Sequence, residues 1–145
     1  MKQIVTWILL ANTREASVLV NRGPGKGLAV LDGVTVRSEE AADPRDKAGV
    51  GHSIAGHSVS AVEQANPQNK VDAEFARKLA DLLSGALGTN QFDRLIVVAG
   101  PHMLGLLRAS FDDALKAALV GEIDKDLSGQ SADAVASYIE GIIAV

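Results

Sequence analysis

The 145 residues fit one domain, and with 47% apolar and 22% charged residues the chain is long enough to bury a core of its own. There is no cysteine, which excludes disulfides and thiolate metal sites and suits a cytoplasmic protein. A net charge of −4 and an aromatic content of 3% argue against a basic or base-stacking surface for nucleic acid. We therefore expect a single cytoplasmic domain over residues 1–145.

The first part of the chain predicts an antiparallel meander of three strands. Residues 4–11 form an apolar run that we interpret as a buried strand, since it lacks the cleavage site of a signal peptide. Further strands are expected over 16–21 and over 28–36, the second with a kink at Asp32-Gly33, and the short connections favour antiparallel pairing. Between them, Gly23-Pro24-Gly25-Lys26-Gly27 lacks the spacing of a phosphate loop and is expected to be a hairpin turn. No run in the chain approaches the roughly 20 apolar residues of a membrane span.

A long polar segment over about 37–68 is the most unusual stretch of the sequence. It is rich in Gly, Ser, Ala, Asp and Pro, and loops longer than about 12–15 residues are usually functional or disordered. Gly51-His52-Ser53 recurs five residues later as Gly56-His57-Ser58. Imidazoles, hydroxyls and glycine amides can bind a metal or a phosphate, although zinc usually requires three or four protein ligands. A flexible polar loop is the simplest interpretation, and the functional hypothesis is a segment over 48–63 that orders on a protein partner, with binding residues His52, Ser53, His57 and Ser58.

The second part of the chain alternates helices and strands. We expect a helix from Pro67 to Gly88 capped by Asn66, a central strand over 92–100, and a helix from Pro101 that continues through Leu115. A short strand within 121–128 and a last helix capped by Ser131 follow. The order β-β-β-α-β-α-β-α predicts an α/β fold with a mixed five-stranded sheet and helices on its faces, as in ribonuclease H-like folds.

Two places carry candidate chemistry outside the long loop. Gly100 and His102 lie where the central strand passes into a helix, and ligands favour the carboxyl ends of strands and helix N-termini; a tight turn with an exposed histidine is the alternative. Glu122, Asp124 and Asp126 alternate, which would place them on one face of a strand, either as Mg²⁺ ligands or as a solvated edge.

No complete catalytic set is evident in the sequence. A ribonuclease H-type nuclease needs acidic residues on its central strands, but residues 6–9 contain none and Asp93 lies at the wrong end of its strand. No serine occupies a G-x-S-x-G elbow. We therefore expect no enzymatic activity, no cofactor and no bound metal.

Several segments resemble the bacterial family of proteins required for attachment to host cells. They occur in the family's order along nearly the whole chain, and the segments over 104–108 and 122–128 are the most specific. The resembling segments are Trp7 to Asn12 with Arg14 to Ala16, Gly56 to Glu63, Phe75 to Ala80, Phe92 to Pro101, Leu104 to Arg108, and Glu122 to Ser128.

The resemblance implies a role in attachment and a relation to the middle domain of archaeal and eukaryotic release factors. The Gly-Gly-Gln loop of those factors is absent, so peptidyl-tRNA hydrolysis is not supported, and Asn12 and His102 stand where the family often has Asp and Arg. We expect a non-enzymatic binding or regulatory protein with an unknown protein partner and an indirect effect on attachment. The alternatives are a ribosome- or RNA-associated factor with phosphate contacts from Arg14, Arg94 and Arg108, and a metal-dependent hydrolase using Asp124, Asp126 and a loop histidine.

Overall fold

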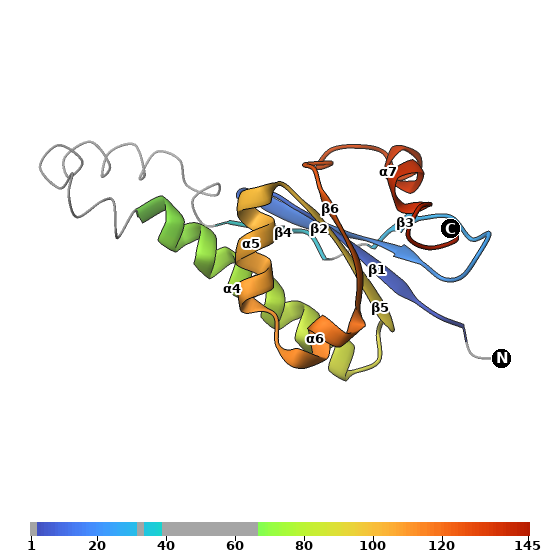
Figure 1. The fold of residues 1–145 in the computed structure, drawn as a ribbon, viewed down its shortest axis with the longest axis horizontal. Coiled ribbons are helices and arrows are strands. Elements are labelled where there is room, and N and C mark those ends of the chain that lie inside the picture. Colours follow the sequence, from blue (N-terminus) through green and yellow to red (C-terminus); the bar gives the residue numbers. More distant parts are fainter. Residues whose placement is uncertain (1–2, 32–33, 39–66) are drawn as a thin grey trace, which may run out of the picture.

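The computed structural model describes residues 3–31, 34–38 and 67–145, and these form a sheet flanked by helices (Figure 1). Most of the predicted loop, including its candidate residues His52, Ser53, His57 and Ser58, lies outside the described residues. The elements in chain order are β1 (Thr6–Ala11), β2 (Glu15–Asn21), β3 (Ala29–Val30), β4 (Val36–Arg37), α4 (Pro67–Gly88), β5 (Arg94–Ala99), α5 (Pro101–Ser110), α6 (Asp113–Ala118), β6 (Leu119–Asp124) and α7 (Ala132–Ile139).

The sheet is mixed, as predicted, with the strand order β3-β2-β1-β5-β6. β1 pairs antiparallel with β2 and parallel with β5, and β5 pairs parallel with β6. β1 and five of the six residues of β5 are buried, because helices cover both faces of these central strands.

The third strand, predicted over 28–36 with a kink at Asp32-Gly33, is two separate strands rather than one kinked strand, and residues 32–33 themselves lie outside the described residues. These are β3 and β4, which both pair antiparallel with β2 and bring the sheet to six strands in the described part of the chain. Val30 pairs with Leu19 and Val36 with Ala16. Val30 and Val36 are six positions apart, but their partners Leu19 and Ala16 are only three positions apart, so the two ladders cannot belong to one regular strand.

Alternation along the strands divides the core between the two faces of the sheet. Trp7 and Leu9 of β1 pack with α4, α5 and α6, whereas Ile8 and Leu10 pack with α7 on the opposite face. Figure 1 shows the same arrangement, with α4, α5 and α6 together on one side and α7 on the other. The sheet therefore separates the buried residues into two clusters, one on each face.

Helix α4 begins at Pro67 and ends at Gly88, as predicted. Phe75, Leu79 and Leu83 lie on its buried face, at the 3–4 spacing seen in the sequence.

Among residues 3–31, 34–38 and 67–145, the helices lack the combination of length and apolar character that a membrane crossing requires.

The single helix predicted from Pro101 through Leu115 is also wrong, because the chain forms two helices there. α5 ends at Ser110, and Phe111 has an extended backbone with φ −74° and ψ 135°. The Asp112 side chain then accepts a hydrogen bond from the Leu115 amide at 2.8 Å and begins α6. Phe111 and Leu115 remain buried, so the break redirects the chain without removing either from the core.

The last strand and the last helix differ from the prediction only in their bounds. β6 covers Leu119–Asp124 rather than part of 121–128. Ser131 caps α7 as expected, accepting from the Ala134 amide at 3.1 Å, and Val135 and Ile139 are buried. The glycine-rich segment over 23–27 is a turn between two antiparallel strands, as predicted, with positive φ at Gly23, Gly25 and Gly27.

The cap at Asp112 predicts a pH-dependent contribution to stability. Hydrogen bonds from the Leu115 amide and from the Ser84 hydroxyl favour the ionised carboxylate and lower the pKa of Asp112 below its usual value. A lowered folded-state pKa gives stability that is present above the unfolded pKa and is lost as the pH falls through the folded value. Asp112→Ala is therefore expected to lower the melting temperature at pH 7, and the difference from wild type should disappear well below about pH 4.

Asp113→Ala is the matched control, because it removes a carboxylate one residue further along and leaves the Asp112 cap in place. Thermal melts of the three proteins across pH 2–7, with ~1-unit steps around the carboxylate range, check the expectation. If Asp112→Ala lowers the melting temperature by the same amount at every pH, the cap acts through packing and not through its charge.

Candidate functional site at the carboxyl edge of the sheet

The parallel strands β1, β5 and β6 end at one edge of the sheet, where Ala11, Ala99 and Asp124 are aligned. Open α/β sheets commonly bind ligands at this edge. β1 passes here into the turn that begins at Asn12, and β5 passes through Gly100 into α5. These two junctions place Asn12, Gly100 and His102 at the carboxyl edge, as the sequence predicted for Gly100 and His102.

His102 lies in the first turn of α5 and is held by a carboxylate from α4. Its Nε2 lies 2.9 Å from Oδ2 of Asp72. The side chain of His102 is 51% exposed, whereas that of Asp72 is only 3% exposed. The pair therefore joins a solvent-facing imidazole to a buried acid.

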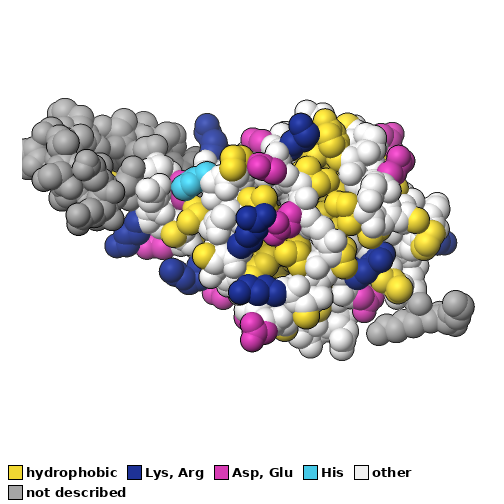
Figure 2. Space-filling model, viewed as in Figure 1, with side chains coloured by type: hydrophobic (Ala, Val, Ile, Leu, Met, Phe, Trp, Pro, Cys, Tyr) yellow, Lys and Arg dark blue, Asp and Glu magenta, His cyan; other side chains and the backbone are white. Residues whose placement is uncertain are grey.

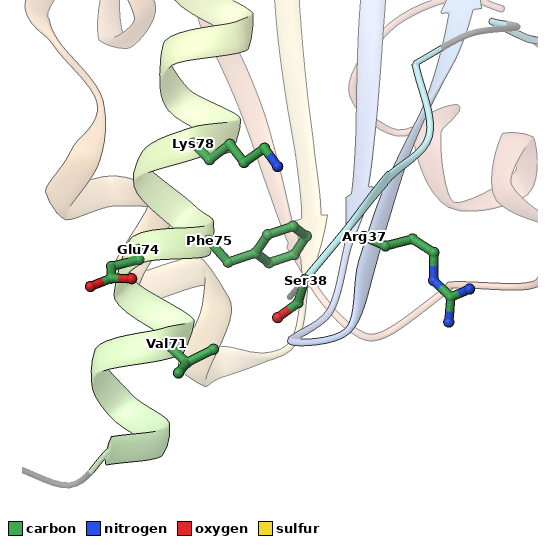
Figure 3. Close-up of a pocket in the computed structure, with 6 residues that line it drawn as sticks. All are labelled: Arg37, Ser38, Val71, Glu74, Phe75 and Lys78. Atoms are coloured by element: carbon green, nitrogen blue, oxygen red, sulfur yellow. The ribbon is translucent and has the colours of Figure 1, made fainter. Parts of the chain in front are cut away.

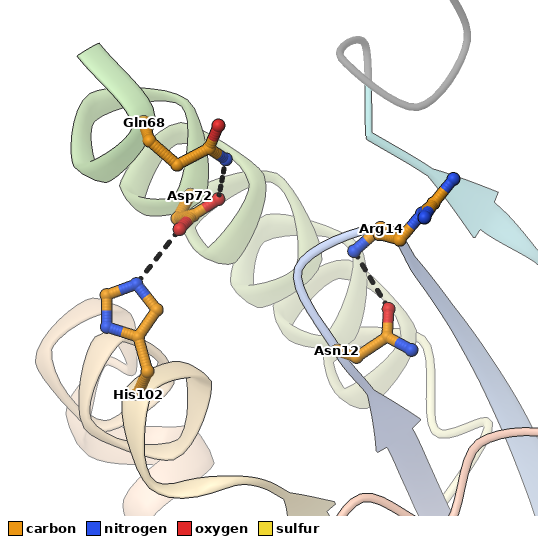
Figure 4. Close-up of polar contacts among 5 residues, drawn as sticks. All are labelled: Asn12, Arg14, Gln68, Asp72 and His102. Carbon is orange, nitrogen blue, oxygen red and sulfur yellow. Dashed lines mark hydrogen bonds and ion pairs between the residues drawn. The ribbon is translucent and has the colours of Figure 1, made fainter. Parts of the chain in front are cut away.

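Asp72 has a second hydrogen-bond partner on its own helix. Nε2 of Gln68 donates to Oδ1 of Asp72 at 2.8 Å, one helical turn earlier in α4 (Figure 4). Both carboxylate oxygens are thus hydrogen-bonded, which offsets part of the cost of burying a charge. We call Gln68, Asp72 and His102 the edge cluster.

Asp72 and Gln68 were not among the predicted site residues, although the sequence carries a signal for Asp72. Asp72 lies three residues before Phe75 and seven before Leu79, so it occupies the apolar face of α4. An acidic residue at such a position must be buried and therefore paired. Its partner could not be inferred, because Asp72 and His102 are 30 residues apart in the chain.

Asn12 and Arg14 form a turn near the edge cluster without joining it. Oδ1 of Asn12 accepts hydrogen bonds from the amides of Arg14, at 2.8 Å, and Glu15, at 2.9 Å. The carbonyl group of Asn12 is therefore used to shape the turn between β1 and β2. Figure 4 shows the Arg14 side chain pointing toward β4 and away from His102.

The structure places Arg94 and Arg108, two of the predicted phosphate contacts, at separate positions. Arg94 begins β5 at the opposite edge of the sheet, where its Nε donates to the Thr6 hydroxyl at 3.1 Å. Nε of Arg108 bonds both carboxylate oxygens of Glu122, at 2.9 and 3.0 Å, and this hydrogen bonding raises the pKa of Arg108. Arg94, Arg108 and His102 therefore do not form one basic site.

The predicted row of alternating acids is interrupted. Glu122 and Asp124 lie on β6, but Asp126 follows the strand, and its side chain accepts from the Ser128 amide at 3.0 Å. Within residues 3–31, 34–38 and 67–145, His, Asp and Glu side chains nowhere gather in threes with the geometry to hold a metal ion.

A small pocket lies on the other side of α4, between that helix and β4 (Figure 3). Its volume is about 80 Å³, and it is lined by Arg37, Ser38, Val71, Glu74, Phe75 and Lys78. Phe75 and Val71 point toward β4, whereas Glu74 and Arg37 point away from the space between the two elements. The Ser38 hydroxyl is buried, with no hydrogen-bond partner in the described part of the chain.

Comparison with known proteins supports the resemblance drawn from the sequence. Residues 7–139 match the family model described as "Protein required for attachment to host cells". No curated protein matches the chain. The matched range includes all three members of the edge cluster.

Proposed function

Because this chain belongs to the family of proteins required for attachment to host cells, we propose that it is a non-enzymatic binding protein that recognises a protein partner through the edge cluster. Its effect on attachment is then indirect, exerted from the cytoplasm through that partner. The observation that carries the proposal is the half-exposed imidazole of His102 fixed by the buried carboxylate of Asp72.

This geometry suits recognition because the contact group is held in place before a partner arrives. His102 is on the first turn of α5 and Asp72 is on α4, two helices that pack on the same face of the sheet. A side chain that is already immobilised loses little freedom on binding, which improves affinity. Functional groups on helices are also placed more accurately than groups on loops. The segment over 48–63 is also expected to contribute to partner binding, and it lies outside the described residues.

We also propose that the fold is ribonuclease H-like. The strand order β3-β2-β1-β5-β6, with β2 antiparallel and β5 and β6 parallel to β1, supports this assignment. A shared fold does not carry a shared activity, so the assignment adds nothing to the choice of function.

The ribosome- or RNA-associated alternative is less well supported by the described surface. Arg94 and Arg108 donate hydrogen bonds within the protein, to Thr6 and Glu122. Figure 2 shows lysine and arginine side chains intermixed with aspartate and glutamate on the face that carries α5 and α6, rather than one basic stripe. A surface of mixed charge favours a protein partner over a phosphate backbone.

Comparative affinity capture tests the proposal. Tagged wild type, His102→Ala and Arg22→Ala are used to enrich partners from the cytoplasm of the source cells, with quantitative mass spectrometry as the readout. Arg22 is the control because it is exposed and follows β2 at the edge opposite His102. We expect wild type and Arg22→Ala to enrich the same partner, and His102→Ala to enrich it about tenfold less, the loss typical of a residue important for binding.

Two outcomes would contradict the proposal. Equal enrichment by wild type and His102→Ala would show that the edge cluster is not the recognition surface. Salt-sensitive co-sedimentation of the protein with a ribosomal subunit on sucrose gradients would instead favour the ribosome-associated alternative.

A further inference from the structure

Asp72 occupies a position on α4 where an apolar residue would cost less free energy. It is buried on the same helix face as Phe75 and Ala76, in contact with α5 through His102. Burying a carboxylate is unfavourable unless it is fully paired, and well-packed apolar replacements of buried ion pairs are often neutral or stabilising. Stability alone therefore does not account for a carboxylate at this position, and its geometry toward His102 suggests another role.

The contact with Asp72 constrains the proton on the imidazole. A carboxylate only accepts hydrogen bonds, so a ring nitrogen 2.9 Å from it must carry the hydrogen. That nitrogen is Nε2, and in the neutral ring Nδ1 is then the unprotonated acceptor. Figure 4 shows Nδ1 on the side of the ring that points away from Asp72.

The second oxygen of Asp72 makes this arrangement rigid. Gln68 donates to Oδ1 at 2.8 Å, which fixes the plane of the carboxylate from within the same helix. The remaining oxygen, Oδ2, then faces His102 in one orientation. Partners of this kind behind a functional histidine set both its tautomer and its ring orientation.

We infer that Asp72 is a positioning residue that holds His102 in the Nε2–H tautomer, so that Nδ1 is the atom that contacts the partner. The partner group at this contact is an N–H or O–H donor, because the neutral ring offers a lone pair there. The choice of contact atom rests on the proposed function, whereas the tautomer is a property of the free protein.

The tautomer is tested by NMR of the intact protein labelled with ¹⁵N on histidine. In wild type we expect the imidazole N–H proton of His102 to be bonded to Nε2 and to exchange slowly. In Asp72→Leu, which keeps the branching of the side chain and removes the acceptor, this proton should exchange about tenfold faster or more, as expected for loss of a hydrogen bond to a charged group. Asp81→Leu is the matched control, because it removes the same charge from the exposed face of the same helix.

Asp72→Asn provides a conservative variant, since its amide oxygen can still accept the Nε2 proton. It should retain the tautomer with intermediate protection from exchange. A proton on Nδ1 in wild type, or equal exchange in wild type and Asp72→Leu, would overturn the inference. A merely structural role for Asp72 would change the melting temperature and leave the protonated nitrogen unchanged.

The contact atom is tested by capture with His102→Arg, which keeps a partner for Asp72 but presents only donors. We expect this variant to lose the partner as His102→Ala does, and retained capture would overturn the assignment of Nδ1 as an acceptor. Failure of the proposed function is distinguishable, because His102→Ala would then capture normally while the NMR result still holds. If instead the positioning role fails, His102→Ala would lose the partner, and the NMR spectra would show no effect of Asp72 on the protonated nitrogen.

Discussion

Phe92→Ala is expected to lower the free energy of unfolding by about 3–5 kcal/mol, the largest effect of any single replacement considered for this protein. Phe92 is 1% exposed and precedes β5, where its ring lies 4.8 Å from the ring of Trp7 at an interplanar angle of 30°. Truncation removes the buried surface, the ring–ring contact and the support for both central strands. The cavity cannot collapse easily, because Trp7 is held in β1 between β2 and β5.

Urea unfolding measures this loss of free energy. The unfolding is monitored by far-ultraviolet circular dichroism and by the fluorescence of Trp7, the only tryptophan of the chain. Phe92→Leu is the control, and it should cost less than the alanine variant because it fills more of the space. Coincident transitions by the two probes would support two-state unfolding and allow the free energies to be compared. A loss below about 1 kcal/mol for Phe92→Ala would mean that Trp7 and its neighbours repack around the missing ring.

Much of the architecture could be predicted because the strands and helices carry their period in the sequence. The uninterrupted apolar run at 95–99 indicated a strand buried on both faces, and the 3–4 spacing of Phe75, Leu79 and Leu83 indicated the inner face of α4. Two breaks were missed for local reasons. The register between β3 and β4 depends on pairing with β2, and the end of α5 depends on the cap at Asp112, which competes with continuation of an apolar period that still places Phe111 and Leu115 inside.

The candidate site was predictable only in part, because its two sides come from different helices. A histidine after Gly100-Pro101 at the end of a central strand indicated one side. Asp72 carried the weaker signal of an acid on an apolar face, and nothing in the sequence paired it with His102 rather than with a lysine or arginine. Arg94 and Arg108, which the sequence offered together as phosphate contacts, donate hydrogen bonds to Thr6 and Glu122 at separate places, and no pattern in the sequence indicated these partners.

His102→Ala is expected to destabilise the protein by about 1–3 kcal/mol, and a second replacement at Asp72 should restore the loss. Removing the imidazole leaves Oδ2 of Asp72 buried without this partner, with Gln68 still bonded to Oδ1. The 3–5 kcal/mol typical of breaking a fully buried ion pair is reduced here, because His102 is half-exposed and water can reach the vacated space.

Asp72→Leu and the double variant Asp72→Leu/His102→Ala complete the cycle, with unfolding free energies from urea titrations at pH 7. Asp72→Leu should be close to wild type or more stable, because the unpaired imidazole it leaves is solvent-exposed. The double variant should then exceed His102→Ala in stability, giving a coupling of about 1 kcal/mol or more between the two positions. Additive losses would show that His102 stabilises α5 by itself. If the double variant matches wild type in stability and yet captures no partner, then the Asp72–His102 pair is maintained for recognition and not for folding.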